Sequence, residues 1–355
     1  MNARNRPDEV IWDITYACPL RCLHCYSESG RRPSRRLSHA DMLRVADAIV
    51  AMRPRGVAIA GGEPLLIKDL TAVIARMVEG GLSVALYTSG WLMTEDLARS
   101  LAEVCDRVAV SVDGATPATH DRIRGRNGSF AHAMRALRLL DDVAAERRAQ
   151  GREPLTFGID CVLLQSNFAE MDELCQVVAP RFPELGFVAF GAAVPGGLAN
   201  RRGFDEHELL TEEQTGLLDN PGFASRLREL APGSVTVTAT DNRILQMHPV
   251  LVARGAVFDA LQIEPDGEVR AMPIYEGTVG NILTESPEVL WQRATARWSD
   301  PFVVEALSTA FTMREWAEAA RRIDYRFGSD AVRARIDRRP AYLGAEVGSG
   351  PSDSA

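Results

Sequence analysis

The sequence has no long apolar segment. No run of apolar residues approaches the ~20 residues with which a helix crosses a bilayer. The first nine residues contain no apolar core like that of a signal peptide, so we expect a cytoplasmic protein with no membrane partner. The net charge of −8 argues against a nucleic-acid partner, because domains that bind nucleic acids are usually basic.

Cysteine is scarce and unevenly distributed. The 355 residues include six cysteines, of which three lie within residues 18–25 and none follows Cys175. This pattern fits a reducing compartment better than the dense disulfide framework of small secreted domains. The three dispersed cysteines, Cys105, Cys161 and Cys175, are predicted to be small buried side chains.

The clustered cysteines Cys18, Cys22 and Cys25 follow a predicted strand at residues 11–15, with the spacing C-x3-C-x2-C. Three thiolates can hold three irons of a [4Fe–4S] cube and leave its fourth iron open. A structural zinc site needs a fourth Cys or His, and His24 lies inside the tight turn between two ligands. Three clustered cysteines cannot all pair as disulfides. The spacing favours an iron–sulfur cluster, with zinc or inert thiols as alternatives.

Predicted strands and helices alternate through the first 204 residues. This alternation indicates a parallel sheet, whose sites lie at the carboxyl ends of the strands. Five polar or thiol side chains fall at such ends and predict one shared pocket: Cys18, Glu63, Ser89, Ser111 and Asp113. The number of strand–helix units predicts an α/β fold, an open partial (β/α)6 TIM-like barrel rather than a closed eight-stranded one.

The alternation ends near residue 205. A capping box at residues 211–214 opens a helix, and residues 261–270 are typical of a β-hairpin with a Pro-Asp-Gly turn. We therefore expect a small α+β appendage over 205–343, after a barrel over 1–204. The tail at 344–355, rich in Gly, Ser, Pro and Asp, is predicted to be disordered.

The cysteine loop, with the aromatic Tyr26 directly after its third cysteine, resembles the signature of the radical S-adenosylmethionine (radical SAM) enzymes. Residues 61–64, Gly-Gly-Glu-Pro, resemble the GGEP motif of that family, which contacts the methionine amino group. Two glycines at a strand end also let the backbone approach a ligand closely. The resemblance implies S-adenosylmethionine as a cofactor on the open iron, cleaved reductively to a 5′-deoxyadenosyl radical.

Residues 111–130 and 193–197 narrow the resemblance to the subgroup that carries a C-terminal SPASM or twitch module. It implies that Ser111 contacts the ribose and Arg124 the methionine carboxylate. The cofactor-binding residues expected on this basis are Tyr26, Gly61, Gly62, Glu63, Pro64, Ser89, Ser111, Asp113 and Arg124. Met272 stands where the module has a cysteine for an auxiliary cluster, so we expect a degenerate module and one cluster only.

Asp160 and Cys161 are adjacent in the strand predicted at residues 157–164. Because alternate residues of a barrel strand face its interior, one of the two is expected to point into the pocket as a catalytic residue. An inward-facing Cys161 could donate a hydrogen atom to a substrate radical.

The family resemblance leaves the substrate open. We favour a small sugar- or nucleoside-like metabolite, tailored by epimerisation, decarboxylation, elimination or rearrangement, because few residues precede the first predicted strand and no peptide-recognition domain is expected there. The alternative is a maturase of a ribosomally made peptide. An alternative of another class is a non-catalytic iron–sulfur or zinc protein, against which the intact Glu63, Ser111 and Arg124 count.

The chain shows no second cluster or flavin motif, so the electron must come from another protein, a flavodoxin or ferredoxin. Five arginines flank the cysteine loop: Arg21, Arg31, Arg32, Arg35 and Arg36. They predict either an ordinary solvated loop or a docking patch for this acidic donor.

Overall fold

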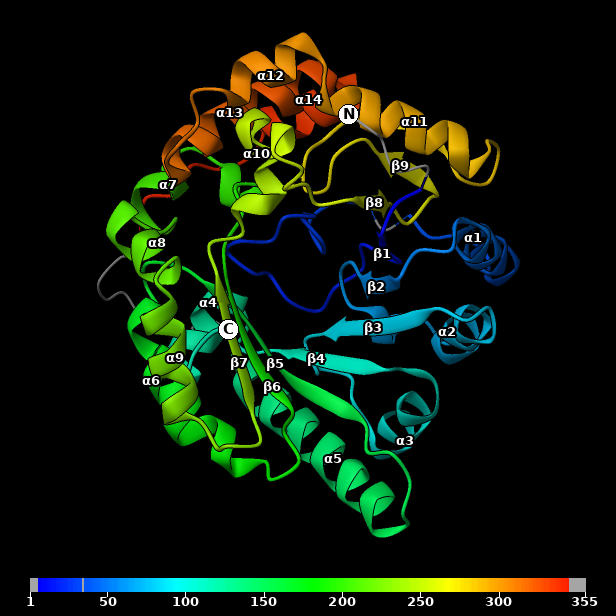
Figure 1. Ribbon diagram of the computed structural model, residues 1–355, viewed down its shortest axis with the longest axis vertical. Coiled ribbons are helices and arrows are strands. Elements are labelled where there is room, and N and C mark those ends of the chain that lie inside the picture. The colour runs from blue at the N-terminus through cyan, green and yellow to red at the C-terminus, as the bar shows by residue number, and fades with distance from the viewer. Residues whose placement is uncertain (1–5, 34, 345–355) are drawn as a thin grey trace, which may run out of the picture.

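The computed structural model describes residues 6–33 and 35–344 (Figure 1). Their strands form one sheet in the order β10-β9-β8-β1-β2-β3-β4-β5-β6-β7. Neighbours from β8 through β1 to β7 are parallel, and the β8–β9 and β9–β10 pairs are antiparallel. The strands are β1 (Glu9–Asp13), β2 (Gly56–Ala60), β3 (Ser83–Thr88), β4 (Arg107–Ser111), β5 (Thr156–Leu163), β6 (Phe187–Ala192), β7 (Thr236–Thr240), β8 (Ala260–Ile263), β9 (Glu268–Arg270) and β10 (Thr278–Asn281).

Helices cover the convex side of the curved sheet, and this arrangement confirms the predicted partial barrel (Figure 1). The barrel helices are α1 (His39–Met52), α2 (Leu70–Glu79), α3 (Glu95–Val104), α4 (Pro117–Arg124), α5 (Ser129–Ala149) and the short α6 (Met171–Glu173). The later helices are α7 (Phe204–His207), α8 (Glu212–Leu218), α9 (Pro221–Leu230), α10 (Pro249–Ala253), α11 (Pro287–Trp298), α12 (Pro301–Leu307), α13 (Met313–Phe327) and α14 (Asp330–Asp337). None of the helices in the described ranges is long and apolar enough to cross a membrane.

The strands alternate between a core face and a concave face. In β2, Val57 and Ile59 are buried in the core beneath the helices, whereas Ala58 and Ala60 are half-buried on the opposite face. Strand register places Ala58 beside Ala85 of β3, so their side chains share one face. Small side chains on the concave face leave space in front of the sheet, where a ligand can lie.

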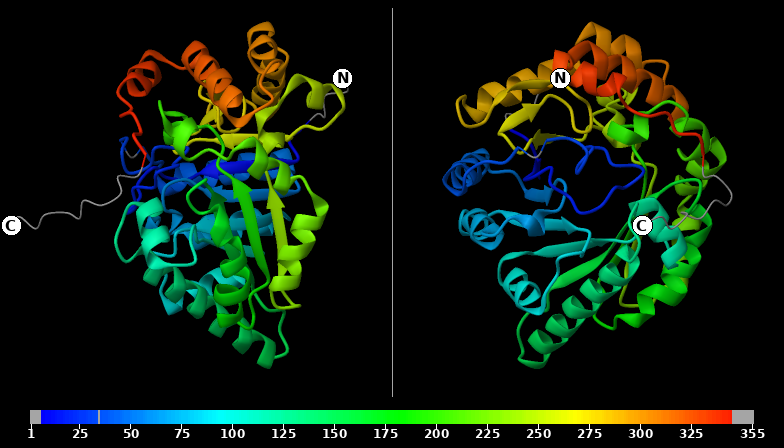
Figure 2. Two further views of the ribbon diagram at one scale, coloured as in Figure 1. Left: turned by 90° about the vertical axis from the view of Figure 1, so that its left-hand side faces the viewer. Right: turned by 180° about the vertical axis from the view of Figure 1, so that it is seen from behind.

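The C-terminal region continues the barrel sheet. β7 pairs with β6 and β8 pairs with β1, so the region adds strands at both edges. The predicted hairpin is confirmed: β8 and β9 are antiparallel around a turn in which Gly267 has a φ of +85°. Helices α11–α14 gather over the β8–β10 edge (Figure 2). The boundary at residue 205 stays a prediction, and residues 345–355 lie outside the described residues.

The segment after β1 packs against the segment after β2 through main-chain contacts. The N–H of Gly62 donates to the carbonyl of Thr15 (2.6 Å), and the N–H of Glu63 donates to that of Ala17 (2.9 Å). Gly61 has a φ of +121°, and a Cβ atom on Gly62 would lie 2.1 Å from the Ala17 oxygen. The two glycines therefore allow a close approach to the protein's own backbone, in addition to any approach to a ligand.

We expect Gly62→Ala to lower the free energy of unfolding by about 1–3 kcal/mol, because the added methyl group overlaps a backbone oxygen that cannot move aside. Urea denaturation measures the change. Gly216→Ala is the matched control: its Cβ would meet no atom within 4 Å, and in a helix the change should stabilise by up to ~1 kcal/mol. Equal stability of the two variants would contradict the close-contact argument.

Candidate active site

The cysteine loop, residues 14–33, is held at the carboxyl ends of the strands by main-chain hydrogen bonds. The N–H groups of Arg21 and Leu23 donate to the carbonyls of Arg124 (3.0 Å) and Ile123 (2.8 Å) at the end of α4. On the other side, the carbonyl of Cys25 accepts from the N–H of Leu198 (3.0 Å) in the short 3-10 helix Gly197–Asn200. Elements that lie far from the loop in sequence therefore fix its shape.

The three cysteines of the loop are free thiols, with Cys22 buried and the other two partly exposed. The N–H of Leu20 points at the Cys18 sulfur (3.4 Å) and the N–H of Ser29 at the Cys25 sulfur (3.3 Å). Burial raises the pKa of Cys18 to about 12 and that of Cys22 to about 11. Three thiols, two of them with N–H donors that stabilise bound sulfur, fit the ligand set of a [4Fe–4S] cube.

A single-ion zinc site finds no support in residues 6–33 and 35–344. No three His, Cys, Asp or Glu side chains in these ranges are arranged to hold one metal ion. His24 was the candidate fourth ligand, but its Nε2 lies 2.8 Å from Oδ2 of Asp113.

Asp113, just beyond β4, is the hub of the polar contacts beneath the loop. Its fully buried carboxylate accepts from Nη2 of Arg124 (2.8 Å) and from the N–H of Val162 (2.9 Å), besides its contact with His24. Its own N–H donates to Nδ1 of His120 (3.1 Å). Burial would raise the pKa of Asp113, but the charges of Arg124 and His24 hold it well below the usual range.

Arg124 lies between this carboxylate and the cluster cysteines. Its Nη1 is 3.9 Å from the sulfur of Cys22, and its Nε is 2.7 Å from Oδ2 of Asp113. Burial would lower the pKa of Arg124, but the charge of Asp113 and that of Cys22 in its ionised form raise it above its usual value. The guanidinium therefore stays charged beside Cys22.

Glu63 is fully buried, and its carboxylate meets four protein donors. One oxygen accepts from the hydroxyl of Thr88 (2.7 Å) and the N–H of Leu65 (3.1 Å). The other accepts from the N–H (2.9 Å) and the hydroxyl of Ser89. Because a carboxylate offers about four acceptor positions, a contact with the methionine ammonium would have to displace one of these donors. Pro64 begins the 3-10 turn that follows.

Of the remaining predicted cofactor residues, Tyr26 is half-buried and donates its hydroxyl to Oδ1 of Asp13 (2.5 Å) at the end of β1. Asp13 also accepts from the side chain of Gln262 in β8 (2.8 Å). Ser111 ends β4 and is partly exposed. The aromatic residue after the third cysteine thus anchors the loop to the sheet.

Asp160 and Cys161 face opposite sides of β5. Cys161 is 2% exposed and belongs to the apolar core with Ile159 and Leu163, so it does not lie on the concave face where a substrate radical would form. Asp160 is partly exposed on the concave face, beside Ser111 in the strand register. Burial raises the pKa of Asp160 to about 6. The inward-facing member of the pair is Asp160, which corrects the hydrogen-donor hypothesis for Cys161.

The arginines predicted as a docking patch are mostly engaged within the protein. Arg31 donates to the carbonyls of Arg21 (2.6 Å) and Cys22 (3.2 Å). Arg32 pairs with the carboxylate of Glu264 (3.5 Å), and Arg35 pairs with that of Asp266 (2.9 Å). Arg36 is exposed. The patch that remains open to a partner is therefore smaller than the sequence suggests.

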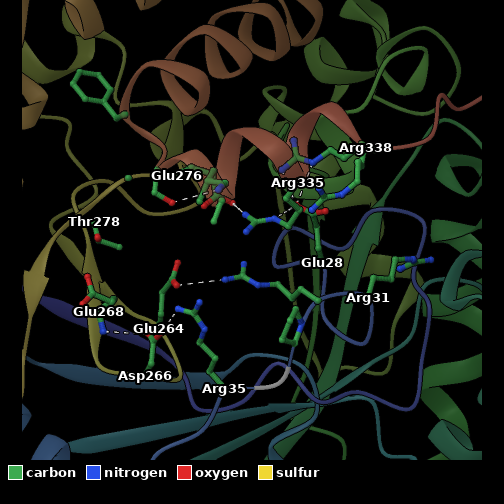
Figure 3. A pocket seen from close by; sticks show the side chains of 18 of the residues that line it. Glu28, Arg31, Arg35, Glu264, Asp266, Glu268, Glu276, Thr278, Arg335 and Arg338 are labelled. Atoms are coloured by element: carbon green, nitrogen blue, oxygen red, sulfur yellow. Dashed lines mark hydrogen bonds and ion pairs between the residues drawn. The ribbon is translucent and has the colours of Figure 1, made fainter.

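A cavity of about 780 Å³ lies between the cysteine loop, the β8–β9 hairpin and α14, and charged side chains line it (Figure 3). Glu28, buried at a φ of +53°, accepts from Arg335 (2.9 Å) and Arg339 (2.7 Å). Arg335 also contacts Glu276, which lies 3.6 Å from the buried Arg270. Sequence reasoning missed this network, because Glu28 and Arg335 are 307 residues apart.

Met272, which the resemblance places where the module has an auxiliary-cluster cysteine, lies just after β9 (Glu268–Arg270). Its side chain is 1% exposed within the apolar core. A thioether packed in this way belongs to the hydrophobic interior, and the degenerate module stays a prediction.

Residues 12–151 match the family model described as the radical SAM superfamily. Mycofactocin maturase MftC of Mycobacterium ulcerans is 34% identical over 165 residues, 46% of this chain and 42% of MftC. The AdoMet-dependent heme synthase of Methanosarcina barkeri is 29% identical over 188 residues, 52% of this chain and 50% of the synthase. The chain thus spans about half, or less, of the length of these curated relatives.

Among solved structures, Streptococcus suis SuiB bound to precursor peptide SuiA superposes with a TM-score of 0.61 at 14% identity. The superposition covers 87% of this chain and 68% of that of SuiB. At this identity the likeness concerns the fold, which extends from the barrel into the C-terminal region.

We expect Asp113→Asn to lower the free energy of unfolding by about 3–5 kcal/mol, because it leaves the buried guanidinium of Arg124 without its counter-charge. Denaturant titration measures the loss. Asp172→Asn is the control, since it breaks the exposed Asp172–Arg226 pair (2.7 Å) and should cost about 1 kcal/mol or less. Similar losses in both variants would mean that the Asp113 contacts do not hold the site together.

Proposed function

We propose that this chain, whose residues 12–151 match the radical SAM superfamily model, is an enzyme that binds one [4Fe–4S] cluster through Cys18, Cys22 and Cys25. The cluster would supply the electron that cleaves S-adenosylmethionine to methionine and a 5′-deoxyadenosyl radical, which removes a hydrogen atom from the substrate. The observation that carries the proposal is the loop of three free thiols at the carboxyl ends of parallel strands, beside a buried arginine.

The chain's own residues would bind and orient the S-adenosylmethionine. Arg124 offers a charged guanidinium beside Cys22, which suits a carboxylate ligand, and Ser111 at the end of β4 offers a hydroxyl for the ribose. Glu63, whose carboxylate is held by β3, would fix the turn formed by Gly61 and Gly62. Asp113 would hold Arg124 in place rather than touch the ligand.

The substrate that we propose is a peptide, in place of the small metabolite favoured by the sequence. Support comes from the relatives: MftC is named a maturase, and SuiB was solved with a precursor peptide. The similarity to an AdoMet-dependent heme synthase keeps a small-molecule substrate as the second candidate.

A separate flavodoxin or ferredoxin would deliver the electron. Just after the cysteine loop, Arg36 is exposed and Arg35 is mostly exposed, so positive charge follows the loop on a chain of net charge −8. Such charge raises the rate of association with an acidic partner more than the final affinity.

We expect the protein, reconstituted anaerobically with iron and sulfide, to bind about four irons and to release 5′-deoxyadenosine from S-adenosylmethionine after reduction with dithionite. Replacement of all three loop cysteines by alanine should abolish both properties, because these thiols are the proposed ligands of the cluster. Iron analysis and chromatography of the nucleoside measure them.

The matched control for this experiment replaces Cys105, Cys161 and Cys175 by alanine. These cysteines are buried outside the loop, so the variant should still bind about four irons per chain if it folds. Iron that stays with the loop variant, or iron lost only from the control, would contradict the proposed cluster site.

A further inference from the structure

Asp160 presents its carboxylate to the concave face of the barrel. The register of β5 places it between Ser111 of β4 and Ala189 of β6. Its neighbours in β5 point the other way, into the core under the helices. The side chain is therefore directed toward the space in front of the sheet and not toward the protein interior.

The surroundings of Asp160 on this face are small or exposed. Around Asp160 on the concave face, Ala109 of β4, Gly158 of β5, and Ala189 and Gly191 of β6 carry at most a methyl group. Beyond them, Thr238 of β7 is exposed at the level of Asp160. Toward the open barrel edge, the residues level with Asp160 are therefore a methyl side chain, Ala189, and an exposed threonine, Thr238.

Within residues 6–33 and 35–344, the Asp160 carboxylate makes no hydrogen bond and no ion pair, unlike Asp113, which is neutralised by Arg124. The cation on the same face, Arg107, is held elsewhere: its guanidinium stacks on the Phe187 ring, 3.4 Å from the centroid. Phe187 in turn packs over Gly158, where a Cβ atom would come within 2.6 Å of the ring. Asp160 thus remains available to a ligand.

A partly buried carboxylate without a protein partner loses part of its hydration and gains no hydrogen bond in return, which is costly. The partner that best offsets this cost is a cation with hydrogen-bond donors, because charge-assisted bonds are stronger than neutral ones. Ser111, which we assign to the ribose, lies beside Asp160 in the strand register. A cation bound to Asp160 would therefore lie next to the nucleoside. This is where a substrate must lie to meet the 5′ carbon.

We propose that Asp160 binds an ammonium or guanidinium group of the substrate, so that the enzyme acts on a peptide segment with a basic side chain. This inference rests on the proposed function, because it needs S-adenosylmethionine beside Ser111. A different donor, the ribose diol of S-adenosylmethionine itself, could also reach Asp160, and the experiment separates the two.

The test compares two probes on the reconstituted protein with S-adenosylmethionine bound: N-acetyl-lysine methylamide and its uncharged counterpart N-acetyl-norleucine methylamide. We expect the wild type to bind the lysine probe roughly ten- to a hundred-fold more tightly, as measured by NMR titration. Asp160→Asn should bind both probes equally, and Asp160→Glu should retain part of the preference. Asp142→Asn, a change at an exposed position of α5, should keep it in full.

The inference would be overturned by a failed charge preference or by a change in cofactor binding. The first means that the wild type shows no preference for the lysine probe, or that the preference survives in Asp160→Asn. The other is a roughly ten-fold loss of S-adenosylmethionine affinity in Asp160→Asn, which would assign the carboxylate to the ribose. Release of 5′-deoxyadenosine by the wild type, measured alongside, distinguishes these outcomes from failure of the proposed function itself.

Discussion

The buried carboxylate of Asp113 is the interaction on which the rest of the site depends. It sets the position of Arg124, contacts His24 in the cysteine loop, and accepts from the main chain of β5. Three separate segments therefore meet at one charge, which is stable in the interior only because its counter-charge is equally fixed. The same pair keeps a cation beside Cys22 without exposing it to water.

Two kinds of small residue shape the space around that pair. Glycines at the end of β2 let the cysteine loop lie against the sheet backbone, and alanines and glycines on the concave face keep the barrel open. The glycines after β2 help to position the cluster ligands, and the small residues of the concave face leave space for a substrate. Both depend on the absence of side-chain atoms more than on any specific contact.

Patterns local in sequence were predictable, and contacts between distant segments were not. Three features depend only on residues close together in sequence: the cysteine spacing, the alternation of strands and helices, and the Pro265–Gly267 turn. By contrast, the choice between Asp160 and Cys161 depends on strand register, because a shift by one residue exchanges the two faces. The ion pair between Arg35 and Asp266 could not be predicted either. A run of arginines has the same sequence whether its side chains are solvated or paired.

The contact of Glu28 with two arginines at the end of α14 makes the order of chain synthesis relevant to the cluster site. Glu28 of the cysteine loop is synthesised 307 residues before Arg335, which contacts it. Such a contact must overcome a large loop-closure entropy before it contributes stability. The contacts of Glu28 therefore form only after the segment that contains Arg335 and Arg339 has been made.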